Sequence, residues 1–295
     1  MPTSRLMREL RLRRGAPRGR VPQCPPELLP PRLRHDAPPR RPVLRGALRL
    51  KRAAEQKFAN PELLARLQNA TPASVGVGRT GFRYRTKTLL KFLTRFAVAK
   101  AAVESQVPEG WGEAQGWLAL KSQIESPEQF LLRPDLGRQL NDASMDLVRE
   151  RCKRDNTVQI VVGDGLSANA VMLNAPTMVA SLTRALDNAG ISYGTTVFVR
   201  YCRSKQIDVI GQEVGARVGI ILVGERPGLG TGDGMSAYFV WQPADERIDA
   251  EKQAISNIHQ RGLPPEEAGV QAVRVIQAIL DQQTSGVKLN LEHIS

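Results

Sequence analysis

The chain has 295 residues, 41% of them hydrophobic, which is enough for one large domain or two smaller ones around a real core. The net charge of +13 resembles that of a nucleic-acid-binding protein, but almost all of it lies in residues 1–52, which hold 15 basic and three acidic residues. Residues 53–295 hold 27 basic and 26 acidic residues. The body therefore gives no reason to expect a nucleic-acid partner, and its fully apolar runs are too short to predict a transmembrane helix.

Cysteines and histidines are few and scattered along the chain. The three cysteines are odd in number and form no CxxC pair, so we expect no disulfide framework and a reducing, cytoplasmic location. The three histidines are far apart in sequence, so we expect no histidine-based metal site.

Residues 1–52 are predicted to be a disordered tail. They contain ten of the 20 prolines and most of the excess arginine, a composition that cannot build a core. They lack the continuous apolar segment of a secretory signal. A basic arm of this kind could contact nucleic acid or an acidic surface. The alternatives are a solvated tail and a coding region whose start is assigned too far upstream.

Residues 53–126 are predicted to form a small helical domain. The pattern predicts, in chain order, a helix over 53–70 that breaks near Pro61, a glycine-rich basic segment over 75–84, a helix over 86–104 and a second helix over 112–122. The helix over 86–104 carries its apolar residues at helical spacing, which is the clearest signal in this region.

Residues 127–295 alternate between strand-like and helix-like patterns with short connections. The apolar, β-rich segments are 157–167, 195–205, 217–228 and 236–243. The helical segments are 135–152, 176–190, 206–216 and 264–286. This alternation predicts an α/β fold with a Rossmann-like, mainly parallel sheet.

Polar residues and glycines follow three of the predicted strands, at 163–167, 200–205 and 224–228. In parallel α/β sheets ligands bind beyond the carboxyl ends of the strands. We therefore expect these three segments to converge on one binding surface.

The three segments match no complete nucleotide-binding or catalytic signature. In GDGLSA, Ala168 stands where a dinucleotide fingerprint has its third glycine, and NAPTM is expected to interrupt the helix that should follow. Neither a GxxxxGK[ST] phosphate loop nor a GxSxG elbow occurs. Single acids such as Asp164 and Glu225 are more often loop or cap acceptors than catalysts. We predict a binding surface without catalytic residues or metal ligands of its own.

Six segments taken together resemble the small (light) subunit of ethanolamine ammonia-lyase. They are VGRTGFRYRTKTLLKFL, LLRPDLGRQL, VVGDGLSANAV, VFVRYCRSKQIDVIGQEVGA, VGIILVGERPGLG and ISNIHQRGLPPEEA. The resemblance implies a lyase of large and small subunits that depends on adenosylcobalamin and converts ethanolamine to acetaldehyde and ammonia by radical chemistry. It also implies that the large subunit holds the substrate, and that the small subunit covers the cobalamin at the interface between them.

The resemblance also implies which residues contact the cofactor. Carried over position by position, the family's cobalamin contacts fall on Ser204, Glu225 and Ala254, with Arg203 and Gly224 beside them. Relatives carry other residues at 204 and 254, so backbone contacts are expected there. The carboxamide arms of cobalamin are hydrogen-bond donors, which the Glu225 carboxylate can accept.

Two further hypotheses concern the tail. N-termini in this family vary and can direct the enzyme into bacterial microcompartments through a short amphipathic helix, and residues 4–14 have helical spacing. The alternative function is a non-enzymatic nucleotide- or nucleic-acid-binding module that uses the basic tail. A stand-alone dinucleotide enzyme is a second alternative.

Overall fold

The computed structural model describes residues 60–71, 73–229 and 232–291. The predicted tail over 1–52 and the predicted microcompartment segment lie outside the described residues. Every element named below belongs to the compact unit Gln56–Ser295.

The first described helix is α2 (Pro61–Ala70). Its N-terminus is capped by Asn60, whose side-chain oxygen accepts the N–H of Leu63 at 2.9 Å. Pro61 therefore begins a helix instead of breaking one, because a proline at the first helical position loses no hydrogen bond.

Helix α3 (Thr86–Glu104) confirms the helix predicted over 86–104. It follows a short hairpin of β1 (Arg79–Thr80) and β2 (Arg83–Tyr84). The hairpin turns at Gly81, whose φ of +60° favours glycine.

The helix predicted over 112–122 is wrong. One helical turn, α4 (Trp111–Ala114), is followed by strand β3 (Leu118–Lys121). Gly116, with φ of +78°, reverses the chain between them. Strand β3 then pairs in parallel with β5 (Val197–Arg200), so the main sheet includes residues on both sides of the expected boundary at residue 126.

The main sheet has six strands in the order β3-β5-β4-β6-β7-β8. Its remaining strands are β4 (Val158–Gly163), β6 (Val218–Gly224), β7 (Met235–Trp241) and β8 (Lys252–Ile258). Strands β3, β5, β4 and β6 pair in parallel, whereas β7 and β8 are antiparallel to their neighbours. The α/β class is confirmed, and the sheet is mixed because β7 and β8 add an antiparallel edge.

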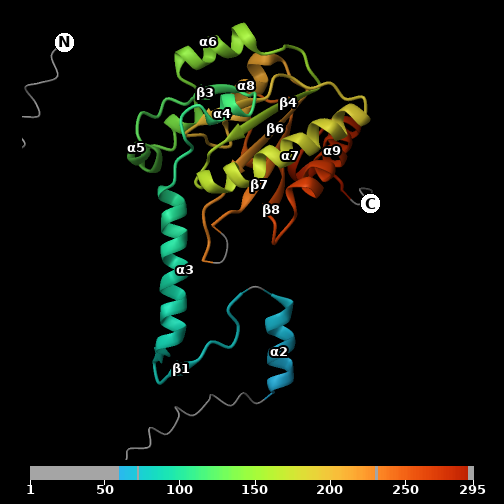
Figure 1. Cartoon of the computed structure of the whole chain (residues 1–295). Helices are drawn as coiled ribbons and strands as arrows, with labels where there is room; N and C mark the ends of the chain where they lie inside the picture. The colour runs from blue at the N-terminus through green and yellow to red at the C-terminus, as the bar shows by residue number, and fades with distance from the viewer. Residues whose placement is uncertain (1–59, 72, 230–231, 292–295) are drawn as a thin grey trace, which may run out of the picture. The chain divides into compact units, whose positions relative to one another are not determined.

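Helices cover both faces of this sheet (Figure 1). One layer consists of α7 (Ala168–Asn188) and α9 (Pro265–Gln282), whose inward residues share the larger core with β4, β6 and β7. The other layer consists of α6 (Asp142–Arg151) and α8 (Gln206–Val214), packed mainly on β4, β5 and β6. The short elements are α5 (Pro127–Leu132), η2 (Leu136–Arg138), η3 (Asp249–Glu251) and η4 (Gly286–Lys288).

Two helix starts differ from the prediction. Helix α7 begins at Ala168 and continues through Pro176, so NAPTM does not interrupt it. Its inward face is buried along its whole length, and this packing outweighs the cost of an internal proline. Helix α6 begins at Asp142 instead of near residue 135, because Asn141 accepts the N–H of Ser144 and caps it there.

Candidate functional site

The tips of β4 and β6 pack directly on each other. Leu166 N–H donates to the Gly224 carbonyl at 2.9 Å, and a Cβ at Gly165 would lie 2.2 Å from the same oxygen. A Cβ at Gly224 would lie 2.1 Å from the carbonyl oxygen of Ser167. The contact between these two loops therefore requires glycine at both positions. A contact of Gly224 with a cofactor stays a prediction.

Asp164 joins the tips of β4 and β5. Its carboxylate accepts the N–H groups of Tyr201 and Cys202 at 2.7 and 2.8 Å. Burial raises the pKa of Asp164 to about 6, outweighing these two hydrogen bonds, which lower it. Burial likewise raises the pKa of the Cys202 thiol well above its usual value, which disfavours the thiolate form. Asp164 acts on the site by fixing the backbone that leads into Arg203 and Ser204.

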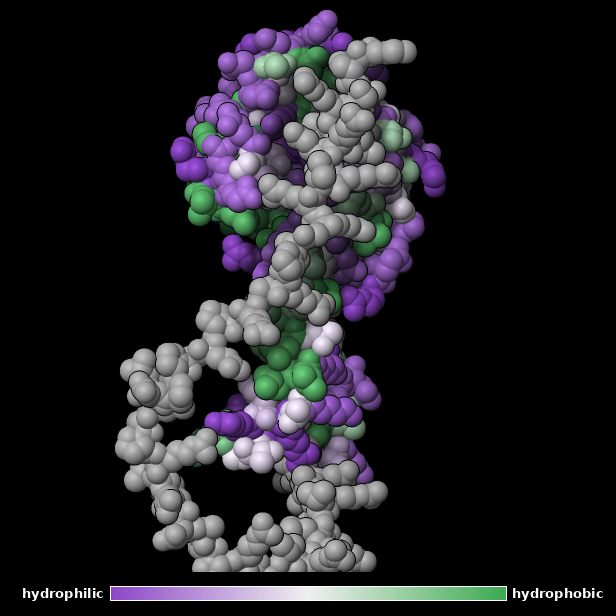
Figure 2. Space-filling view, turned by 60° about the vertical axis from the view of Figure 1, so that its left-hand side comes forward, coloured by the Kyte–Doolittle hydropathy of each residue, from purple (hydrophilic) through white to green (hydrophobic). Residues whose placement is uncertain are grey.

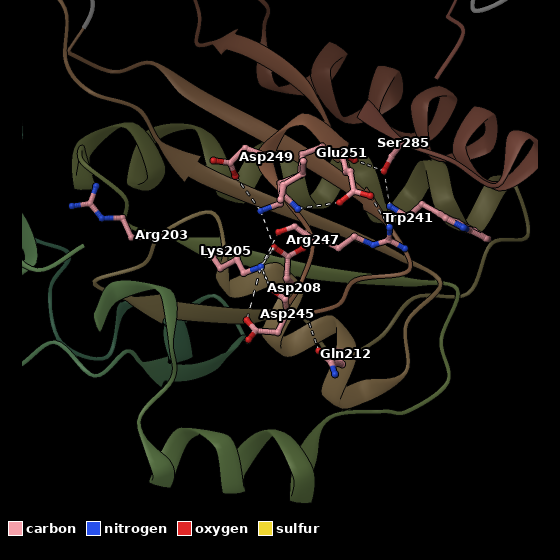
Figure 3. A network of polar contacts seen from close by, with 12 residues as sticks. Arg203, Lys205, Asp208, Gln212, Trp241, Asp245, Arg247, Asp249, Glu251 and Ser285 are labelled. Atoms are coloured by element: carbon pink, nitrogen blue, oxygen red, sulfur yellow. Dashed lines mark hydrogen bonds and ion pairs between the residues drawn. The ribbon is translucent and has the colours of Figure 1, made fainter. Parts of the chain in front are cut away.

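The segment between β5 and α8 carries two of the predicted contact residues. Arg203 stacks on the Phe130 ring, with its guanidinium carbon 4.2 Å from the ring centroid, and donates to the Phe130 carbonyl at 2.8 Å. Ser204 is half-buried in the turn before α8. The Arg203 side chain is thus engaged by α5, and Figure 3 shows it apart from the polar network around Lys205.

Glu225 and Ala254 come together through a residue that the sequence did not single out. The Tyr238 hydroxyl donates to Glu225 Oε1 at 2.6 Å, and Tyr238 is the register partner of Ala254. Desolvation, helped by the Glu225 carboxylate, raises the pKa of Tyr238 to about 12, so its hydroxyl remains a donor. Ala254 is exposed, and so is Ser256, which lies two residues further along the same face of β8.

These residues form a surface that we call the β7–β8 face: Glu225, Tyr238, Ala254 and Ser256. It lies on the side of the sheet that carries α8. Its exposed side chains on β8 are small, so a flat ligand can approach the backbone there. The Glu225 carboxylate, which accepts the hydroxyl of Tyr238, lies at the end of this face that is beside the tip of β6.

A buried charge cluster supports the other end of this face (Figure 3). Lys252 Nζ lies 2.8 Å from Asp208 Oδ2, and both side chains are almost fully buried. Lys205 Nζ lies 3.5 Å from the same oxygen and donates to the carbonyls of Asp245 and Arg247. Burial raises the pKa of Asp208, and the lysines partly oppose that shift. The cluster ties the start of α8, which follows Ser204, to the start of β8, which precedes Ala254.

The loop 242–251 completes this support. Arg247 pairs with Glu251 at 2.8 Å, and Glu251 also accepts the backbone N–H of Ile248 at 3.0 Å. The Ser285 hydroxyl donates to the Glu251 carbonyl and accepts the N–H of Trp241 at 2.9 Å. The loop is therefore held from both ends before the chain enters β8.

A model of the ethanolamine ammonia-lyase light chain family (EutC) matches residues 61–290. The chain belongs to this family. The family assigns the chain to a lyase that acts on ethanolamine, and a light chain implies a hetero-oligomer with a large subunit. Among the described residues of this light chain, no group of three or more His, Cys, Asp or Glu side chains could hold a metal ion. The described helices include none long and apolar enough to cross a membrane.

The sequence missed Tyr238, Lys252 and the whole of β8 in this light chain. The alternation of side chains along β7 was a usable signal for Tyr238. Its neighbours Ala237 and Phe239 are fully buried on one face of the sheet, so Tyr238 must point to the other face. Strand β8 had no such signal, because Gln253, Ser256 and Asn257 interrupt any apolar run.

Proposed function

We propose that this chain is the light chain of an adenosylcobalamin-dependent ethanolamine ammonia-lyase, and that its β7–β8 face covers the cobalamin at the interface with the large subunit. The observation that carries the proposal is the Glu225–Tyr238 pair beside the exposed Ala254. The family match supports a lyase that acts on ethanolamine, and the proposed reaction is the conversion of ethanolamine to acetaldehyde and ammonia.

The residues of this face fit the cofactor chemically. Cobalamin is a broad ring rimmed by carboxamides, whose N–H groups need acceptors. Glu225 uses Oε1 for Tyr238, which leaves Oε2 for a carboxamide. Ala254 and Ser256 project little beyond the backbone, so β8 can accept a wide ligand without displacing side chains. Ser204, before α8, would contribute a backbone group, whereas the backbone N–H of Arg203 already donates to the Gly137 carbonyl at 3.0 Å.

When bound, adenosylcobalamin supplies a carbon-centred radical by homolysis of its cobalt–carbon bond. The light chain would position the ring and exclude water from it. We place no catalytic residue in this chain, because the proposal assigns the substrate to the large subunit.

The strand order also favours this location. From β4 the chain runs first to β5, on one side of β4, and then crosses to β6, on its other side. Rossmann-like sheets have a reversal of strand order of the same kind. Ligands bind at the carboxyl ends near such a point. The loops after β5 and β6, which carry Ser204 and Glu225, leave the sheet there.

The proposal is tested by the affinity of the purified two-subunit complex for adenosylcobalamin. Glu225→Ala removes the acceptor and is expected to weaken binding by about 10- to 100-fold, the worth of a hydrogen bond to a charged group. Glu267→Ala, which removes an exposed carboxylate at the start of α9, is the matched control. Equal affinities for wild type and Glu225→Ala would move the cofactor elsewhere.

The location inside a microcompartment and the alternative role of the tail are separate proposals. A reporter fused to residues 1–20 that stays diffuse in cells with microcompartments would count against encapsulation. Deleting residues 1–52 should leave lyase assembly intact. If the chain is instead a nucleic-acid-binding module, the same deletion should abolish a salt-dependent affinity for nucleic acid.

A further inference from the structure

Helix α3 carries a stripe of exposed apolar side chains. Leu89, Phe92, Leu93 and Phe96 follow one another at helical spacing, and between 43 and 53% of each is exposed. The rings of Phe92 and Phe96 stack with centroids 6.4 Å apart. We call these four residues the α3 stripe. Figure 2 shows hydrophobic residues gathered along α3. A contiguous exposed apolar patch on a folded chain is typical of an interaction site, and protein–protein interfaces are one class of such sites.

The buried residues of α3 lie C-terminal to the α3 stripe. The buried residues of α3 are Ala99 and Ala102. Ala102 lies beside the loop after β6, where a Cβ at Gly232 would come within 3.5 Å of it. At 100° per residue, Ala102 lies on the opposite side of the helix from Leu93, whereas Ala99 lies within about 20° of Phe92 but two turns further along the helix.

The side of α3 opposite the stripe carries three basic residues, together with the exposed Val98. Lys87, Lys91 and Arg95 follow at intervals of four residues. From Arg79 to Glu104 the chain has seven basic residues and one acidic residue, a net charge of +6, although residues 53–295 together are nearly neutral. A partner surface that fits this helix is therefore an apolar groove flanked by acidic side chains.

Charge argues against two other occupants. A second copy packed stripe to stripe would bring two segments of net charge +6 together. The chain's own residues 1–52 carry a net charge of +12, so they would also be repelled.

We infer that α3 docks into an apolar, acidic-rimmed groove of the large subunit, with the α3 stripe as its anchor. This inference rests on the proposed function, since a light chain requires a heavy partner. It also gives the complex a second attachment. One contact is made around the cofactor by the β7–β8 face, and the other is made by α3, whose C-terminal turn lies beside the loop that follows Glu225.

The test compares two double variants of the full-length chain, each titrated against the large subunit. Leu89→Gln with Leu93→Gln alters the stripe. Leu132→Gln with Leu173→Gln is the control, since those two leucines are 80 and 67% exposed on α5 and α7. Glutamine has nearly the helix propensity of leucine, so circular dichroism should show α3 retained. Each buried leucine contributes roughly tenfold or more to an affinity.

The stripe variant is expected to bind the large subunit about 100-fold more weakly, with the control within about threefold of wild type. If both variants bind like wild type, or both weaken equally, the docking role of α3 is overturned while the proposed function stands. If wild type itself fails to bind the large subunit, the proposed function and this inference both fall. Loss of self-association in the stripe variant, with unchanged binding to the large subunit, would make a second copy the occupant and overturn the inference.

Discussion

The buried pair of Asp208 and Lys252 offers a stability test whose magnitude follows from the structure. Their charged atoms lie 2.8 Å apart, with the side chains 0 and 2% exposed. Removing one partner of such a pair strands the other charge in a medium that cannot solvate it, which costs about 3–5 kcal/mol. Asp208→Asn leaves the ammonium of Lys252 buried, with only the highly exposed Asp249 at 3.5 Å, and we expect the free energy of unfolding to fall by an amount near the upper end, about 5 kcal/mol.

Lys252→Met is expected to cost less, about 3 kcal/mol, because Lys205 remains 3.5 Å from the Asp208 carboxylate. In the double variant Asp208→Asn/Lys252→Met neither charge is left behind. The double variant should therefore lose at least about 2 kcal/mol less than the sum of the single losses.

The assay is urea unfolding of the purified chain followed by circular dichroism, with a double-mutant cycle over the four proteins. Lys205→Met is a useful control, since its side chain is 20% exposed and its loss should cost the least of the three. Single losses that add up in the double variant, to within about 0.5 kcal/mol, would refute the view that these two charges depend on each other.

Three further predictions follow from the site. Because burial raises the pKa of Asp164 to about 6 from 3.8, the folded chain holds this proton more tightly than the unfolded chain. The contribution of Asp164 to stability is thus present below about pH 4 and is lost as the pH rises to about 6. Over that window the free energy of unfolding of the wild type should fall by about 2–3 kcal/mol relative to that of Asp164→Asn. Parallel pH profiles of the two proteins would contradict this. Gly224→Ala should lower the free energy of unfolding in urea by about 3 kcal/mol, because its Cβ would lie 2.1 Å from a backbone oxygen. Gly234→Ala has open space around the new Cβ and should stay within about 0.5 kcal/mol of wild type. Equal losses in the two variants would contradict this prediction. Tyr238→Phe should cost about 1 kcal/mol and raise the KM of the complex for adenosylcobalamin without changing kcat, since Tyr238 only positions Glu225; a fall in kcat alone would argue against that role.

The sequence predicted the elements whose burial is uniform. Strands β4 and β6 are buried at every position, and a continuous apolar run identifies such strands without tertiary information. The predicted bounds of helix α3, about 86–104, agree with the structure because proline and glycine follow the helix and its apolar spacing is regular. The edge strands β3 and β8 were missed, since each is short or half-exposed and depends on a neighbouring strand that the local pattern does not reveal.

The candidate site was partly accessible for the same reason. Glycines and polar residues after β5 and β6 indicated the edge of the sheet at which the candidate site is proposed, and the family resemblance singled out Glu225. The partner of Glu225 could not be read from the sequence, because Tyr238 reaches it through the antiparallel pairing of β7 with β6. The role of Lys252 depends likewise on Asp208, which lies 44 positions earlier in the chain.

The most direct test of the central claim is the release of ammonia from ethanolamine by this chain co-purified with its large subunit. The account predicts release that requires both chains and adenosylcobalamin together, with neither chain active alone. Release by the large subunit alone at the same rate, or no complex between the two chains, would contradict it.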